Sequence, residues 1–310
     1  MVTLRQLRYL EALAETLHFG QAAEACAITQ PALSMQIKEL EDELQVSLIE
    51  RRKSGIELTE QGEEIVRRGR TILASVRDLL DYAKHRERVL SGSLKLGAIP
   101  SIAPYLLPSA LPELQRRFPD LTLHLRETIT ETLIRELISG ELDLILIALP
   151  IVGPEIETFH LFDDKFVLAA RATKGKRATA TDMLAHGRLL LLEEGHCLRD
   201  HAISACGPRR GNWETRVDAT SLLTLIQMVE GGLGVTLLPE ITLKGGILEG
   251  TKLIARPFAP PAPARTLALV ARRTSPRQRD VELLAELILE QRRKSARPGI
   301  PALRRQQAKS

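Results

Sequence analysis

Two cysteines within residues 195–206 are the side chains in this chain best suited to do chemistry. The segment reads GHCLRDHAISAC and places Cys197 and Cys206 nine positions apart. A thiolate is the form of cysteine that peroxide oxidises, and a second thiol can trap the resulting sulfenic acid as a disulfide. The segment therefore has three possible interpretations: a redox pair, a metal site, or an ordinary helix that contains sulfur.

The residues around the first cysteine favour its ionised form. Residues 198–206 are predicted to form a short helix, because a glycine and a proline follow directly. Cys197 then lies at the N-terminus of that helix, where the positive end of the helix dipole favours a thiolate. His196, Arg199 and His201 add groups that can stabilise the anion.

A metal site is the weaker alternative for the same segment. His196, Cys197, His201 and Cys206 supply four suitable ligands within eleven residues. Their spacing does not match a usual zinc pattern, and an intact helix separates the end ligands too widely. We expect no metal and no other cofactor. The third cysteine, Cys26, lies among alanines and is interpreted as a small buried hydrophobe.

Composition indicates a soluble globular protein of two or three domains. The chain has 310 residues, 44% hydrophobic and 26% charged. No apolar run approaches the roughly 20 residues of a membrane helix, and three cysteines do not make a disulfide framework, so a cytoplasmic location and no membrane partner are expected. The formal net charge of the chain is +4. Residues 292–310 hold seven Lys/Arg and no Asp/Glu, so the rest of the chain has a net charge of −3. This basic tail is predicted to be disordered.

Residues 1–58 are predicted to form a helical DNA-binding unit. Two short helices, joined by a tight connection at 27–28, fit a helix-turn-helix, and Pro31 suits the first turn of the second helix. Residues 51–59 then indicate a turn and a short strand, as in a wing.

Residues 59–91 are predicted to form a long linker helix that pairs two chains. Hydrophobic residues recur every seven positions, which is the spacing of a coiled-coil seam. The two series are Ile65, Ile72 and Leu79, and Val76, Ala83 and Leu90.

Residues 92–291 alternate between strand and helix patterns, which indicates an α/β doubly wound fold. Two such units are expected to form two lobes with a cleft between them. Lobe I is assigned to 92–163 plus 267–291, and lobe II to 164–266.

The sequence resembles a known family at several of these points. FGQAAEACAITQPALSMQIKELEDELQVSLIERR, followed by LTEQG, resembles the winged helix-turn-helix of LysR-type transcriptional regulators, and GGLGVTLLP extends the similarity. AIPSIAPYLLP, LLLLEEGHCLRD and DATSLLTL are most similar to the peroxide-sensing OxyR branch. The resemblance implies a two-lobed, periplasmic-binding-protein-like regulatory domain and a transcription factor rather than an enzyme.

For DNA binding, the resemblance implies that the helix beginning at Gln30 enters the major groove. The residues it assigns to bases or phosphates are Gln30, Pro31, Ser34, Gln36, Lys38, Arg51, Arg52 and Lys53. Two departures predict an altered site preference. Met35 stands where an arginine is common, and residues 54–55 are Ser-Gly where OxyR relatives carry basic side chains.

For redox sensing, the resemblance implies that Cys197 is peroxidatic and Cys206 resolving. Nine helical residues rise about 13.5 Å, whereas a disulfide requires Cα atoms within roughly 4.4–6.8 Å. The helix must therefore unwind for the bond to form. The implied peroxide pocket consists of Ser101, Thr130, His196, Asp143 and Arg265. Ser101 replaces the usual threonine and keeps only its hydroxyl, which predicts altered peroxide sensitivity.

The partners implied by the resemblance are promoter DNA, hydrogen peroxide, RNA polymerase, a thiol reductant and three further copies in a homotetramer built as a dimer of dimers. Two alternatives remain from the residues themselves. One is a LysR-type regulator that responds to a small metabolite in the interlobe cleft. The other is a thiol peroxidase, which the DNA-binding unit argues against.

Overall fold

The N-terminal region is a compact three-helix unit. The computed structural model describes residues 1–52, 55–84, 89–151, 153–172, 179–205 and 219–295. Its first three helices are α1 (Leu4–Thr16), α2 (Phe19–Ala25) and α3 (Gln30–Leu44). Ala27, with φ of +54°, turns the chain between α2 and α3, and Pro31 lies in the first turn of α3. The predicted helix-turn-helix is confirmed.

The wing differs from its prediction. Residues 51–59 were expected to form a turn and one strand, but β1 (Ile49–Arg52) pairs antiparallel with β2 (Gly55–Leu58). The first strand begins two residues earlier because Leu48 and Ile49 are held by the Glu41 carboxylate, which accepts their backbone N–H groups at 2.7 and 3.3 Å.

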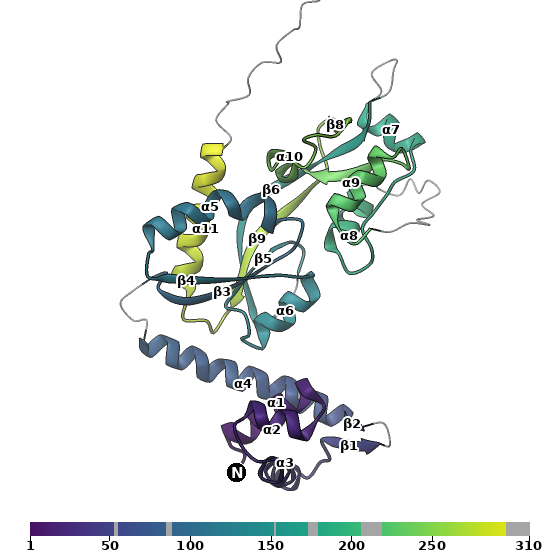
Figure 1. Cartoon of the computed structure of the whole chain (residues 1–310). Helices are drawn as coiled ribbons and strands as arrows, with labels where there is room; N and C mark the ends of the chain where they lie inside the picture. Colours follow the sequence, from purple (N-terminus) through teal and green to yellow (C-terminus); the bar gives the residue numbers. More distant parts are fainter. Residues whose placement is uncertain (53–54, 85–88, 152, 173–178, 206–218, 296–310) are drawn as a thin grey trace, which may run out of the picture.

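The linker helix α4 (Glu60–Lys84) leads from the DNA-binding unit to the regulatory domain (Figure 1). Ile72 is 47% exposed and Leu79 66% exposed, so part of the first seven-residue series forms an open apolar stripe. The second series is wrong at Leu90, which lies beyond the helix. Leu90 is buried in the regulatory domain, and its N–H donates to Asp280 at 2.8 Å.

A mixed sheet forms the centre of the regulatory domain. Its strand order is β4-β3-β5-β9-β6-β7, with β8 also paired to β6. Strands β3, β4 and β5 run parallel, whereas β9 runs antiparallel to β5 and β6. The strands are β3 (Gly92–Ala98), β4 (Leu121–Glu127), β5 (Leu144–Ala148), β6 (Ile156–Arg171), β7 (Thr236–Pro239), β8 (Leu253–Pro257) and β9 (Ala264–Arg272).

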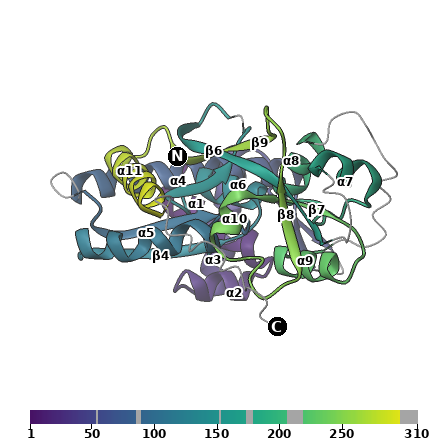
Figure 2. The same cartoon turned by 90° about the horizontal axis from the view of Figure 1, so that it is seen from above.

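Helices cover this sheet and create two hydrophobic cores. The helices are α5 (Ala103–Arg117), α6 (Thr130–Ile138), α7 (Ala180–His186), α8 (Cys197–Ala205), α9 (Leu222–Glu230), α10 (Glu240–Lys244) and α11 (Gln278–Ser295). One core gathers around β3, β5 and β9, with α5 and α11 side by side (Figure 2). The second gathers around the later half of β6, with α8 and α9. Because β6 spans 16 residues, it contributes to both cores.

The last helix extends further than the sequence pattern predicted. It reaches Ser295 instead of ending near residue 291. Lys294 forms an ion pair with Glu290 at 2.7 Å, and Arg292 stacks 3.6 Å above the ring of Phe162. Cations in the last turn also complement the helix dipole. The remainder of the predicted disordered tail lies outside the described residues. Within those residues, no helix is both long and apolar enough to cross a membrane.

Candidate functional site

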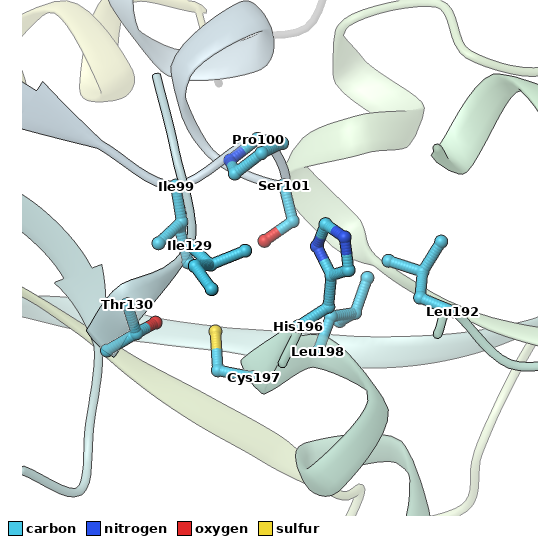
Figure 3. A pocket seen from close by; sticks show the side chains of 9 residues that line it. All are labelled: Ile99, Pro100, Ser101, Ile129, Thr130, Leu192, His196, Cys197 and Leu198. Carbon is cyan, nitrogen blue, oxygen red and sulfur yellow. The ribbon is translucent and has the colours of Figure 1, made fainter. Parts of the chain in front are cut away.

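A small pocket surrounds Cys197 where separate segments of the chain meet (Figure 3). Its lining residues are Ile99, Pro100, Ser101, Ile129, Thr130, Leu192, His196, Cys197 and Leu198. Ile99, Pro100 and Ser101 directly follow the carboxyl end of β3. Strands β4 and β5 lie on opposite sides of β3 in the sheet. Open α/β sheets bind ligands at such a switch point.

The size of this pocket limits what it can hold. The space available to the centre of a water-sized molecule is about 10 Å³, which is about what one water molecule needs. Pockets for drug-sized ligands are typically ~300–1,000 Å³. The pocket therefore suits a molecule of a few atoms and is too small for an ordinary metabolite.

Cys197 is the first residue of α8, so the helix begins one residue before the predicted range and has Cys197 at its N-terminus, as expected. The preceding turn uses Gly195 with φ of +92°, a conformation that favours glycine. The sulfur is a free thiol that points into the pocket toward Thr130, Ile129 and Ser101 (Figure 3). The Cys197 sulfur, a nucleophilic atom, thus faces the cavity of this pocket.

The protonation of this thiol corrects one prediction. Burial raises the pKa of Cys197 above its usual range, so the neutral thiol is favoured instead of the expected thiolate. Three groups oppose the rise: the Thr130 hydroxyl, the charge of Arg265 and the backbone N–H of Cys197 itself. Desolvation outweighs all three, so the thiolate expected at this helix N-terminus is not favoured.

Thr130 stands in an unusual position beside the sulfur. Its Oγ1 is buried and makes no hydrogen bond of good geometry, yet the hydroxyl lowers the pKa of Cys197 through a side-chain hydrogen bond. Both observations are consistent if this hydroxyl donates to the sulfur only when the sulfur carries negative charge. Thr130 is a site residue in the predicted sense, because it lines the pocket.

A fully buried arginine reaches this region from β9. Arg265 donates from Nη1 to the Ser101 hydroxyl at 2.7 Å and from Nη2 to the Ser101 carbonyl at 3.0 Å. The same guanidinium bonds to Asp164 at 3.1 and 3.2 Å. Burial raises the pKa of Asp164, and the charge of Arg265 opposes that rise. The predicted residues Ser101 and Arg265 are therefore joined, with Ser101 lining the pocket.

The sequence patterns do not predict a role for Asp164. It follows Asp163 in an otherwise apolar strand, LFDDKFVLAA, and is only 1% exposed. A carboxylate predicted to be buried in a strand requires a cationic partner, and that requirement was the available signal.

The other predicted groups around Cys197, from α8 and the residue before it, have different positions. His196 lines the pocket, with its Nε2 3.7 Å from a carboxylate oxygen of Glu193. Arg199 donates to the Leu192 carbonyl at 2.9 Å, and the cation that lowers the pKa of Cys197 is Arg265. The role of anion stabiliser therefore belongs to Arg265, which approaches from another strand.

His201 is not a cationic neighbour of the thiol. Its Nε2 lies 2.8 Å from the Leu149 carbonyl, so this nitrogen carries the proton, and Nδ1 is buried without a partner. Burial lowers the pKa of His201, which favours the neutral ring. His201 instead ties α8 to the end of β5.

The prediction for Asp143 is wrong. Asp143 precedes β5, and its carboxylate accepts the backbone N–H of Lys95 at 2.8 Å. The pocket lies past the opposite end of these parallel strands, about 16 Å away for a five-residue strand. The family resemblance predicts Asp143 near the pocket, but the direction of the strands takes it to the other edge of the sheet.

Cys206, and with it the second half of the predicted redox pair, lies outside the described residues. Helix α8 accounts for the nine residues Cys197–Ala205. Among the described residues, His196, Cys197 and His201 do not form a metal-ligating group.

The second candidate surface is the outer face of α3. Leu33, Ile37 and Leu40 are buried against the other helices. The predicted DNA-contact residues that remain exposed are Gln30, Pro31 and Lys38, while Ser34 and Gln36 are partly exposed. The Gln36 amide donates to Glu39 at 2.6 Å. Met35 is 56% exposed on the same surface.

The basic residues of the wing are only partly described. Arg51 and Arg52 belong to β1, next to the hairpin turn. Lys53 lies outside the described residues.

Comparison with known proteins agrees with this arrangement. Residues 4–63 match the family described as "Bacterial regulatory helix-turn-helix protein, lysR family", and residues 87–293 match "LysR substrate binding domain". The chain is 38% identical to the HTH-type transcriptional regulator EstR of Acinetobacter baylyi, over 92% of this chain and 96% of that protein. It is 40% identical to a hydrogen peroxide-inducible genes activator of Pectobacterium carotovorum, over 93% and 96%.

Solved structures give the same result. A full-length OxyR variant from Pseudomonas aeruginosa matches with a TM-score of 0.76 and 38% identity, over 93% of this chain and 95% of that one. An H2O2-bound mutant of Corynebacterium glutamicum OxyR matches with a TM-score of 0.62 and 33% identity, over 94% and 95%. This chain is therefore a DNA-binding transcriptional regulator, not an enzyme, and belongs to the LysR family.

Proposed function

We propose that this regulator senses hydrogen peroxide through oxidation of Cys197 and a reversible Cys197–Cys206 disulfide. The resulting rearrangement of the regulatory domain alters the contacts with promoter DNA. The observation that carries this proposal is a free, partly buried thiol that lines a pocket of about 10 Å³. Peroxide fits such a space, and an effector of ordinary metabolite size does not.

The names of the relatives alone do not decide the effector, and the pocket supports peroxide. Relatives of nearly equal identity include EstR and several proteins named as peroxide-inducible activators. The name of EstR states no effector, so sequence identity alone does not assign one to this chain. The thiol, the two hydroxyls of Ser101 and Thr130, and the small volume favour peroxide.

The proposed reaction has two steps. The Cys197 thiol loses its proton, and the thiolate attacks one oxygen of H2O2, which breaks the O–O bond and releases hydroxide that takes up the proton as water. Cys197 becomes a sulfenic acid. The Cys206 thiol then attacks the Cys197 sulfur, forms the S–S bond and releases the sulfenic oxygen as a second water.

Disulfide formation changes the position of α8. A helix of nine residues keeps its ends about 13.5 Å apart, so the second step requires the helix to unwind. The bonds from His201 to Leu149 and from Arg199 to Leu192 then lose the geometry that they have in the reduced state. The regulatory domain thereby gains two arrangements, one for each redox state.

The remaining parts of the proposal concern DNA and assembly. Gln30, Ser34 and Gln36 contact base edges, while Lys38 and the basic wing residues contact phosphates. The exposed stripe at Ile72 and Leu79 pairs two linker helices. Two such dimers form a tetramer, which contacts RNA polymerase and is reset by a cellular thiol reductant.

The test combines thiol chemistry with DNA binding. The purified full-length chain is treated with one equivalent of H2O2, alkylated, and analysed by mass spectrometry for a Cys197–Cys206 disulfide. Binding to DNA fragments selected in vitro is measured before and after. A disulfide accompanied by altered DNA binding supports the proposal. Absence of the disulfide with unchanged DNA binding refutes it.

Two cysteine variants test the separate roles. Cys197→Ser is expected to abolish the response, whereas Cys206→Ser is expected to accumulate a sulfenic acid that dimedone traps. If Cys206→Ser responds like the wild type, Cys206 is not the resolving residue. Cys26→Ser is the matched control, because Cys26 is the other described free cysteine and lies in the DNA-binding unit.

A further inference from the structure

A buried ion pair joins the linker helix to the regulatory domain. Arg272, the last residue of β9, donates from Nη2 to Asp78 Oδ1 at 2.7 Å and from Nε to Oδ2 at 3.4 Å. Arg272 is 6% and Asp78 7% exposed. Such two-point arginine–carboxylate contacts fix geometry as well as charge.

The regulatory domain holds the arginine of this pair independently of the linker. The Nη1 of Arg272 donates to the carbonyls of Leu137 and Leu142, at 2.8 and 2.7 Å. These carbonyls lie at the end of α6 and just before β5. The guanidinium is therefore clamped in place, and the Asp78 carboxylate of α4 binds to it.

Neighbouring contacts keep α4 close to the same surface. Arg77 donates to the Ser139 carbonyl at 2.5 Å. Gly140 has φ of +76°, and a Cβ at this position would lie 2.6 Å from the Cβ of Ala74. A glycine is thus required for the close approach of the helix. Thr274 adds a hydroxyl bond to Asp78 at 3.4 Å.

Two elements connect this contact to the cysteine pocket. Strand β9 carries Arg265 at its pocket end and Arg272 at its other end, about 23 Å along the strand. It pairs with both β5 and β6, so it lies inside the sheet. Helix α6 begins at Thr130, which lines the pocket, and its last turn includes Leu137, whose carbonyl accepts a hydrogen bond from Arg272. In Figure 1, α6 lies between the sheet and α4.

The linker helix also determines where the DNA-binding unit points. Helix α4 is continuous, and its first half packs on α1. Arg70 of α4 lies 3.6 Å from the carboxylates of Glu11 and Glu15 on α1. A rotation of α4 against the regulatory domain therefore moves α3 with it.

We propose that the Asp78–Arg272 pair positions the linker helix and transmits the redox state of the Cys197 pocket to the DNA-binding unit. Asp78 is a positioning residue that has no part in peroxide chemistry. This inference rests on the proposed peroxide-sensing function. Its distinguishing consequence is that loss of the pair uncouples DNA binding from oxidation and leaves oxidation itself intact.

The experiment uses the full-length chain with Asp78→Asn. We measure the rate of Cys197 oxidation by H2O2 and the ratio of the Kd of oxidised and reduced protein for a fluorescein-labelled duplex selected in vitro. The Cys197 rate is expected to stay within about twofold of wild type, while the Kd ratio falls to within about twofold of one. Hydrogen exchange across residues 70–84 is expected to become faster.

Three further variants make the result specific. Glu64→Gln also removes a carboxylate from α4, but its partners Arg67 and Arg68 lie on the same helix, so coupling should remain. Asp78→Glu keeps the charge and is expected to restore part of the Kd ratio. If Asp78→Asn does not fold, Thr274→Val removes a weaker contact to the same carboxylate and should lower the ratio less.

The outcomes separate this inference from the proposed function. A wild-type Kd ratio in Asp78→Asn overturns the inference, as does an equal loss of Cys197 oxidation, which would make the pair part of the sensor. If the wild type itself shows no redox response, the proposed function fails. Hydrogen exchange then decides alone: faster exchange in residues 70–84 of Asp78→Asn, but not of Glu64→Gln, supports the positioning role, and equal exchange refutes it.

Discussion

Replacing Thr130 with valine should slow oxidation of Cys197 without destabilising the protein. Valine keeps the shape of threonine and removes only the hydroxyl that faces the sulfur. That hydroxyl lowers the pKa of Cys197 and makes no hydrogen bond of good geometry. Its loss therefore removes an interaction made by the thiolate, and no bond of the resting state is broken.

The expected magnitude follows from the strength of one hydrogen bond to a charged group. Such a bond contributes about 1.5–3 kcal/mol, and about 1.4 kcal/mol corresponds to a tenfold change in rate. A thiolate of higher pKa is also more nucleophilic, which recovers nearly half of this effect, so oxidation of Thr130→Val at pH 7 should be roughly 4–15-fold slower than that of the wild type. The free energy of unfolding should be unchanged or slightly higher, because a buried unpaired oxygen is removed.

The assay is the second-order rate of Cys197 oxidation as a function of pH, followed by rapid quenching and thiol alkylation. Because burial raises the pKa of Cys197, the wild-type rate should climb about tenfold per pH unit through neutral pH. Thr130→Val should move the whole profile to higher pH. Thr132→Val is the matched control, since Thr132 lies on the same helix but accepts a bond from exposed Arg135.

One result would refute this reasoning. If Thr130→Val is oxidised within about twofold of the wild-type rate at every pH, the hydroxyl does not act on the thiolate. An equal slowing in Thr132→Val would attribute the effect to α6 as a whole.

The remaining predictions concern assembly, pH and stability. Leu79→Glu, at a residue 66% exposed on α4, should abolish linker pairing and lower the sedimentation coefficient; an unchanged coefficient would place the dimer contact elsewhere. Burial lowers the pKa of His201, so the unfolded state binds more protons as pH falls below about 6.5, and stability should decrease from pH 7 to pH 5. His201→Gln should flatten that part of the dependence in urea unfolding, and an identical slope would contradict the assignment. Asp164→Asn leaves the charge of Arg265 buried without its carboxylate, so the free energy of unfolding should fall by about 3–5 kcal/mol; a loss below about 1 kcal/mol in urea titration would show that the pair is dispensable.

Local sequence patterns succeeded where the structure depends on neighbours along the chain. The alanine-rich helix, the tight connection and Pro31 predicted the helix-turn-helix. The position of Cys197 at a helix start was also predictable, because a helix begins and ends through local capping and turn residues. Family motifs led to Ser101 and Thr130, both of which line the pocket.

Patterns failed where burial or strand direction decided the outcome. Leu90 continued a seven-residue series, yet it belongs to the core of the regulatory domain. The family resemblance predicts Asp143 near the pocket, but it lies at the start of β5, and the parallel strands carry it to the opposite edge. The spacing of residues along the chain does not predict at which edge of the sheet a strand end lies, because that depends on how the strands are ordered and oriented.

The sequence by itself determined the identity of the chemistry: a thiol at a helix N-terminus, within a LysR-type regulator. Only the tertiary structure decided how that thiol is poised. It partly buried Cys197, so that its pKa rises instead of falling, and it brought Arg265 from β9 near the thiol, whereas Arg199 of α8 itself donates to the Leu192 carbonyl. The reason is physical. Desolvation and long-range Coulomb interactions depend on which distant segments exclude water from an atom, and those segments become neighbours only when the chain folds.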